Sequence, residues 1–198
     1  MFDLRLLKSD GSRPTYQDFN YLKCGTDVEA DIIDDIALFK EVHEVFDDLG
    51  FTPDEKTRVY RCVAATLLLG QLEFSDANFD ENGVPCEIIS KEKLADVCHL
   101  LGIADPVEFE QEIVNKPKNP LDPNMVRSPV KLDDCVDARD SLAKAIYNNL
   151  FCWIVKRTNL TIVPQFILDG DTDAEEQTLT IGLLDIFGFE RFKNNYFE

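Results

Sequence analysis

A repeated pattern that starts and stops helices is the strongest constraint on how this chain folds. The segment TPDE at 52–55 combines an N-cap threonine, a proline at the first helical position and a capping glutamate, and the apolar face that follows ends at Gly70. Ser90 and Asp105 open two further helices in a similar way, and Gly102 ends the first of these. The pattern predicts a stack of helices of modest length, not a sheet, for most of the chain.

Two longer helices complete the predicted helical part. Apolar residues at steps of three and four after Asp34 predict a helix that ends near Gly50. The longest helix is predicted from about residue 133 to residue 157. Almost every face of it is apolar around residues 150–155, so we expect its C-terminal end to be buried.

Residues 116–129 interrupt the helices with four prolines, which is too many for a helix and predicts an extended surface loop. The loop and its flank carry Lys116, Lys118, Arg127 and Lys131. These residues form a local basic spot on an otherwise acidic chain.

A different pattern closes the sequence. Residues 179–184 are a dense apolar run, as in a strand buried on both faces, and the run stops at Asp185. Nucleotide-hydrolysing α/β proteins bring an acid to phosphate-bound magnesium in this way, and Gly188 leaves the backbone free to approach a phosphate. Taken alone, an apolar run that ends at an aspartate more often indicates a core strand followed by a turn.

Charge and composition exclude several classes of function. The formal net charge of −18 argues against unspecific binding to nucleic acid or to an anionic membrane. No apolar run approaches the roughly 20 residues of a membrane span. The six cysteines include no C-x-x-C pair and only two histidines accompany them, so reduced, buried thiols are expected instead of a zinc site.

Several segments, in the same order, resemble the myosin motor domain. DIFGFE at 185–190 is similar to the switch II segment of that family, whereas kinesins carry a serine where this chain has Phe189. FNYL at 19–22, VDARDSLAKAIY at 136–147 and LFCWIV at 150–155 resemble further family segments. LLGQLEF at 68–74 also does, with Leu68 and Gln71 in place of the usual histidine and asparagine.

The resemblance implies a mainly α fold that ends in one core strand of an α/β sheet of the P-loop NTPase type. Residues 1–177 would be the helical upper part of the actin-binding cleft, and residues 178–198 a central-sheet strand plus switch II. Asp185 would assist magnesium through water, and the Gly188 amide would contact the terminal phosphate of ATP. Glu190 would pair with an arginine of another switch loop. The implied function is an actin-based, ATP-driven motor in the cytoplasm, associated with the cytoskeleton.

The proline-rich loop would then belong to the actin interface, with Lys116, Lys118, Asn124, Arg127 and Lys131 as candidate contacts. One position of this loop is acidic or phosphorylatable in the family, and it falls near Asn124, which is neither. The alternative for this stretch is a solvated linker with incidental lysines.

Two motifs of the family are missing from these 198 residues: the phosphate-binding G-x-x-x-x-G-K-[ST] and the other switch loop. We therefore expect a fragment of a motor head that is inactive alone, with ATP and Mg²⁺ bound only in the complete head. The alternative is a non-enzymatic helical interaction module derived from such a head.

Overall fold

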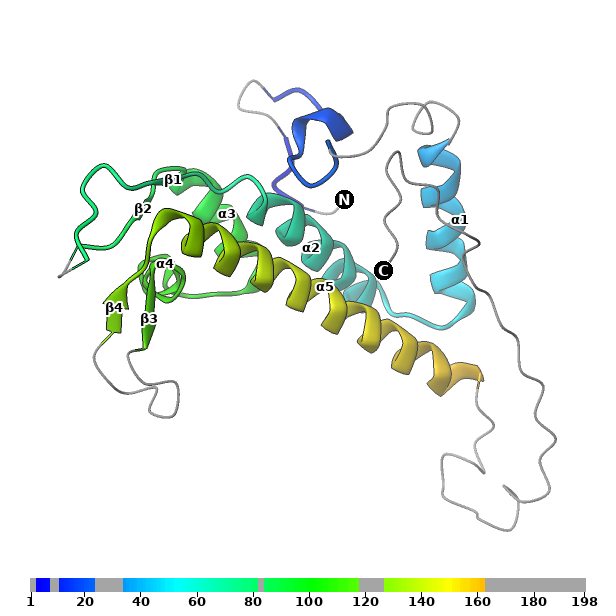
Figure 1. Cartoon of the computed structure of the whole chain (residues 1–198). Coiled ribbons are helices and arrows are strands. Elements are labelled where there is room, and N and C mark those ends of the chain that lie inside the picture. The colour runs from blue at the N-terminus through cyan, green and yellow to red at the C-terminus, as the bar shows by residue number, and fades with distance from the viewer. Residues whose placement is uncertain (1–2, 8–10, 24–33, 82–83, 118–126, 163–198) are drawn as a thin grey trace, which may run out of the picture. The chain divides into compact units, whose positions relative to one another are not determined.

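The computed structural model describes residues 3–7, 11–23, 34–81, 84–117 and 127–162. These residues form a short 3-10 turn, five α-helices and two antiparallel two-stranded sheets (Figure 1). The turn is η1 (Tyr16–Asp18), and the helices are α1 (Asp35–Asp48), α2 (Pro53–Leu69), α3 (Lys91–Leu101), α4 (Pro106–Val114) and α5 (Leu132–Ile162). Strand β1 (Phe74–Ser75) pairs with β2 (Glu87–Ile88), and β3 (Asn115–Pro117) pairs with β4 (Arg127–Pro129). The prediction of a mainly helical chain is confirmed for the described residues.

The chain divides into two compact units, Met1–Thr161 and Ile162–Glu198. The described elements belong to the first unit, apart from the last residue of α5. The strand expected at the C-terminus and the boundary expected after residue 177 lie outside the described residues.

Helix α2 begins where its capping residues predict. The Thr52 hydroxyl accepts a hydrogen bond from the Glu55 amide at 3.2 Å, and the Glu55 carboxylate accepts one from the Thr52 amide at 2.8 Å. This reciprocal capping box satisfies two amides that the first helical turn leaves without partners. At the preceding turn, Gly50 has φ of +70°, the left-handed conformation that a glycine allows at a helix end.

Ser90 precedes α3 but does not cap it through its side chain. Its hydroxyl instead accepts a hydrogen bond from the Glu73 amide at 2.9 Å, while the Ile89 amide donates to the Glu73 carbonyl. The helix starts where predicted, but the capping role is wrong because the serine extends the β1–β2 pairing. Gly102 ends α3 with φ of +72°, as expected.

The main core lies between α2, α3, α4 and the N-terminal half of α5. Small side chains on α2, Ala64 and Ala65, are buried there and allow α3 to pack closely. The largest side chains that are fully buried in this core come from all four helices and β2: Leu68, Leu69, Ile88, Val97, Cys98, Val114 and Cys135.

Helix α5 is longer than predicted, and the expectation that its C-terminal end is buried is wrong. Leu150 and Ile154 pack against a second cluster of Phe46, Phe51 and Val59. On the same half, Phe151 is 62 % exposed and Leu160 is 59 % exposed. Among the described residues, α1 and α2 cover only one side of this half of the helix, so the remaining apolar faces are left in solvent. In the described residues, no helix is apolar enough over its length to cross a membrane.

Arg157 ties α5 to the turn between α1 and α2. Its guanidinium donates to the Glu55 carboxylate at 2.9 Å and to the Gly50 carbonyl at 2.6 Å, and it lies 4.8 Å from the centre of the Phe51 ring. The hydrogen bond from Arg157, followed by the bond from the Thr52 amide, lowers the pKa of Glu55 to about 2.

This tie predicts a loss of stability in acid. Folding lowers the pKa of Glu55. Its contribution to the free energy of unfolding is therefore fully present above its ordinary pKa of 4.5 and is lost as the pH falls toward 2. The free energy of unfolding, measured by denaturant titration between roughly pH 6 and pH 3, should therefore decrease with a slope that Glu55→Gln reduces. Glutamine keeps the cap acceptor but lacks the charge. An unchanged slope in Glu55→Gln would contradict the assignment.

Three of the cysteines are buried, as expected: Cys86, Cys98 and Cys135. The expectation of buried thiols is wrong for Cys152, which is exposed, and Cys62 is only partly buried. All five of these described cysteines are free thiols. Cys24 lies outside the described residues.

Candidate functional site

The candidate nucleotide-site residues Asp185, Gly188 and Glu190 lie outside the described residues, as do Lys118 and Asn124 of the candidate actin loop. The described candidates are Lys116, Arg127 and Lys131. They come from the β3–β4 hairpin and the two residues that connect it to α5.

The hairpin is held directly to the core. Strand β3 follows α4 without a break, and Lys116 pairs with Ser128 across the hairpin. Just after β4, the Val130 amide donates to the Val114 carbonyl at 3.1 Å, and the Val130 side chain is buried. The described ends of the predicted loop are thus two short strands that are fixed at α4 and next to α5.

Each described cation of the hairpin lies beside an acid. Arg127 contacts Glu112 of α4 through two guanidinium nitrogens, and this carboxylate raises the pKa of Arg127. Two exposed lysines have longer contacts: Lys116 Nζ lies 3.7 Å from Asp134, and Lys131 Nζ lies 3.3 Å from Glu81. The basic spot read from the sequence is therefore largely neutralised by acidic residues that are distant along the chain.

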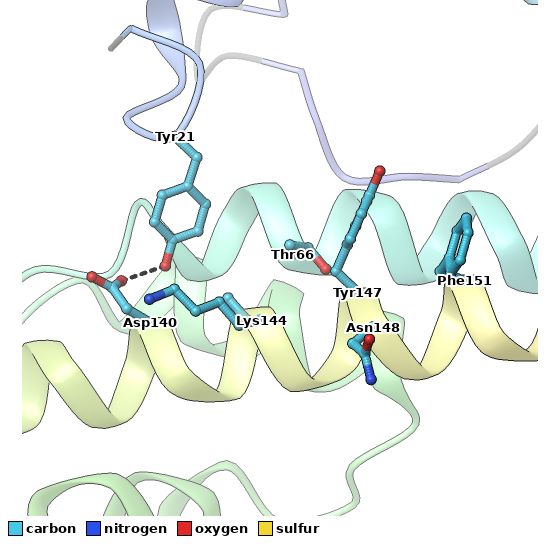
Figure 2. Close-up of a pocket in the computed structure, with 8 residues that line it drawn as sticks. Tyr21, Thr66, Asp140, Lys144, Tyr147, Asn148 and Phe151 are labelled. Atoms are coloured by element: carbon cyan, nitrogen blue, oxygen red, sulfur yellow. Dashed lines mark hydrogen bonds between the residues drawn. The ribbon is translucent and has the colours of Figure 1, made fainter. Parts of the chain in front are cut away.

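A second cluster joins three of the segments that carry the family resemblance, and Figure 2 shows the hydrogen bond between two of its residues, Tyr21 and Asp140. The Tyr21 hydroxyl donates to Asp140 Oδ1 at 2.5 Å, and the adjacent Arg139 donates to the same oxygen at 2.8 Å. Arg139 also donates to the Leu72 carbonyl at 3.1 Å. Tyr21 packs so closely on Gly70 that there is no room for a β-carbon. We call Tyr21, Gly70, Leu72, Arg139 and Asp140 the tyrosine–aspartate cluster.

The electrostatics of this cluster keep Asp140 charged and Tyr21 neutral. Burial first, and then the Asp140 carboxylate, raise the pKa of Tyr21 to about 12. Burial opposes ionisation of Asp140, but hydrogen bonds from Tyr21 and Arg139 hold the pKa of this carboxyl below its usual value. A charged acid that accepts hydrogen bonds from two residues on one oxygen is a structural link between segments, and nothing in it resembles a nucleophile with its base.

A groove of about 630 Å³ lies beside the cluster. Tyr21 and Asp140 are at one end, and Tyr147 and Phe151 line it from α5, with Thr66 contributed by α2 (Figure 2). Lys144 lies near the carboxylate and lowers the pKa of Asp140 by its charge. The groove was not predicted from the sequence. The one sequence feature related to it is the large number of apolar residues in the predicted helix at 133–157.

In the part of the chain that the structure describes, no group of three His, Cys, Asp or Glu side chains is placed to hold a metal ion. The candidate ligand for magnesium, Asp185, lies outside that part of the chain.

Comparison with known proteins gives one consistent result. The family model described as "Myosin head (motor domain)" matches residues 7–198. The chain is 33 % identical over 199 residues to "Unconventional myosin-Id" of Rattus norvegicus, a match that covers 98 % of this chain. It is 32 % identical over 182 residues to "Myosin-I heavy chain" of Dictyostelium discoideum and 31 % identical over 170 residues to "Myosin-1" of Sclerotinia sclerotiorum, with 92 % and 86 % of this chain covered.

These relatives are much longer proteins. The matched region is 18 % of the rat protein, 7 % of the Dictyostelium protein and 13 % of the Sclerotinia protein.

Proposed function

The chain belongs to the myosin head (motor domain) family, and on this premise we propose that it is part of an actin-based motor head driven by ATP hydrolysis. The supporting observation is the family match over residues 7–198, which includes DIFGFE at 185–190. The protein would act in the cytoplasm, in association with the cytoskeleton.

In this proposal, residues 178–198 supply a strand of a P-loop NTPase-type sheet and switch II. Asp185 assists magnesium through a water molecule, and the Gly188 amide contacts the terminal phosphate. Glu190 pairs with an arginine from the other switch loop. A switch II segment positions charge near the phosphate, whereas the cradle of amides and the lysine come from a separate loop. The chain by itself is therefore proposed to be inactive toward ATP.

Residues 1–177 are proposed as the helical upper part of the actin-binding cleft, with the β3–β4 hairpin facing the filament. In the free chain, Lys116 and Lys131 each lie beside an acidic residue, so binding to a filament would have to replace these ion pairs. Exposed ion pairs are weak, so a filament can compete for these two lysines, and salt screens both interactions. We expect weak, salt-sensitive binding.

Sedimentation with actin filaments at low ionic strength tests the proposed surface. The double variant Lys116→Ala/Lys131→Ala should weaken binding by roughly threefold to tenfold, because two exposed cations leave the hairpin. Lys40→Ala/Lys156→Ala is the matched control, since it removes the same charge from exposed positions on α1 and α5. Steady-state ATP hydrolysis of the same samples should stay at background.

Equal weakening by both double variants would mean that only the net charge of the chain matters, and the hairpin assignment would be wrong. Filament-activated hydrolysis by the chain alone would overturn the proposal that a separate phosphate loop is required.

A further inference from the structure

Two buried thiols from distant parts of the sequence meet at one carbonyl group. The Cys86 Sγ donates to the Val130 carbonyl at 3.4 Å, and the Cys135 Sγ donates to the same oxygen at 3.9 Å. Cys86 is 2 % exposed and Cys135 is 0 % exposed. Burial first, and then the neighbouring Cys86 thiol, raise the pKa of Cys135 to about 12. The two sulfurs therefore lie close together in the core, at one carbonyl oxygen.

The elements that carry this pair are short or terminal. Cys86 comes just before β2, a strand of two residues, and Cys135 lies in the first turn and a half of α5. Val130, whose carbonyl they share, connects β4 to α5. Short strands and helix ends open locally at a lower free-energy cost than the middle of a core helix. Local opening can therefore expose this pair while α2 and α3 stay packed.

We propose that Cys86 and Cys135 form a reversible disulfide with a low-molecular-weight disulfide as the oxidant, which makes this pair an oxidative modification site. Among the described residues, Cys62, Cys98 and Cys152 share no such common acceptor with a second described thiol. This inference does not depend on the proposed motor function.

The chemistry is a two-step thiol–disulfide exchange. The Cys86 thiolate attacks one sulfur of the oxidant, which forms a mixed disulfide and releases one thiolate of the small molecule. The Cys135 thiolate then attacks the Cys86 sulfur, which forms the protein disulfide and releases the second small thiolate. The protein loses two protons and two electrons, and the oxidant is reduced to two thiols. The raised pKa of Cys135 makes the second step slow in the closed structure, because the thiolate is the nucleophile.

The disulfide would join the start of β2 to the first part of α5 across the base of the β3–β4 hairpin. It closes a loop of about 50 residues that contains α3, α4 and the hairpin. Constraining such a loop in the unfolded chain stabilises the folded state, so oxidation should raise the thermal unfolding midpoint.

The test is to incubate the folded chain with oxidised glutathione, block the remaining thiols by alkylation and analyse the product. We expect a cross-linked peptide pair that contains Cys86 and Cys135 and has a mass about 2 Da below the sum of the two reduced peptides. The thermal midpoint should rise by roughly 5–10 °C and return to its starting value after dithiothreitol. This reversal needs no variant, so it remains informative if a cysteine substitution prevents folding.

Cys135→Ala should abolish both the cross-link and the rise in midpoint. Cys98→Ala is the matched control, because Cys98 is a buried core cysteine at 1 % exposure outside the pair, and it should leave both effects intact. Recovery of Cys86 and Cys135 as alkylated or separately glutathionylated residues would overturn the proposal. A cross-link that forms without a rise in midpoint, or a rise that Cys98→Ala removes, would also overturn it.

Discussion

Alanine at position 70 is expected to lower the free energy of unfolding by about 2–4 kcal/mol. The backbone there does not require glycine, because φ is −61° and ψ is −13°, which any residue adopts. A β-carbon would, however, lie 2.8 Å from two ring atoms of Tyr21. The ring cannot move freely, since its hydroxyl is bonded to Asp140 at 2.5 Å. The added methyl group must therefore displace Tyr21 and break this bond or shift the end of α2.

Denaturant unfolding of Gly70→Ala measures this effect, and a double-mutant cycle identifies its cause. In a Tyr21→Ala background the methyl group has space, so Gly70→Ala should cost less than about 0.5 kcal/mol there. If the two substitutions were additive, the contact with the Tyr21 ring would not explain the requirement for glycine.

Arg139→Met is expected to destabilise the chain by about 3 kcal/mol. The Arg139 side chain is only 13 % exposed and donates to both Asp140 and the Leu72 carbonyl. Its guanidinium also lies within 6 Å of the Tyr21 and Phe74 ring centres, at 5.9 Å and 5.8 Å. Methionine fills part of the volume but leaves a half-buried carboxylate without its cation. Removing one partner of such a pair costs more than the pair contributes as a whole.

Arg58→Met is the matched control in chemical unfolding. Arg58 pairs with Asp54 at 2.6 Å on the surface of α2, but both side chains are at least 70 % exposed. An exposed pair of this kind contributes at most a few tenths of a kcal/mol. The double variant Arg139→Met/Asp140→Asn should recover part of the loss, because the unpaired charge is then gone. Equal small losses in Arg58→Met and Arg139→Met would contradict the role assigned to Arg139.

Local features of this protein could be predicted from the sequence because their causes are local. The capping box of Thr52 and Glu55 spans four residues, and the helix ends at Gly50 and Gly102 depend on the conformational freedom of one residue. The family resemblance was also visible, because it rests on segments that are contiguous in sequence, and the family match confirms it.

Features that depend on distant partners could not be predicted. Tyr21 and Asp140 are 119 residues apart, and no pattern in the sequence pairs them. From the sequence, Lys116, Arg127 and Lys131 indicated a basic surface. In the structure each of them lies beside an acid, namely Asp134, Glu112 and Glu81 respectively. The apolar C-terminal half of α5 indicated burial, but hydrophobicity does not tell which element will cover a helix face.

The sequence by itself determined where α2 and α3 begin and end and which family the chain resembles, because capping, glycine conformation and contiguous motifs act within a few residues. Only the tertiary structure decided which charges are neutralised, which thiols meet and which glycine is needed for space. Those properties arise from pairs of side chains that packing brings within a few ångströms across tens of residues of chain. Gly70 shows both kinds of cause. The sequence predicts its place at the end of α2, whereas the requirement for a residue without a β-carbon comes from the Tyr21 ring packed against it.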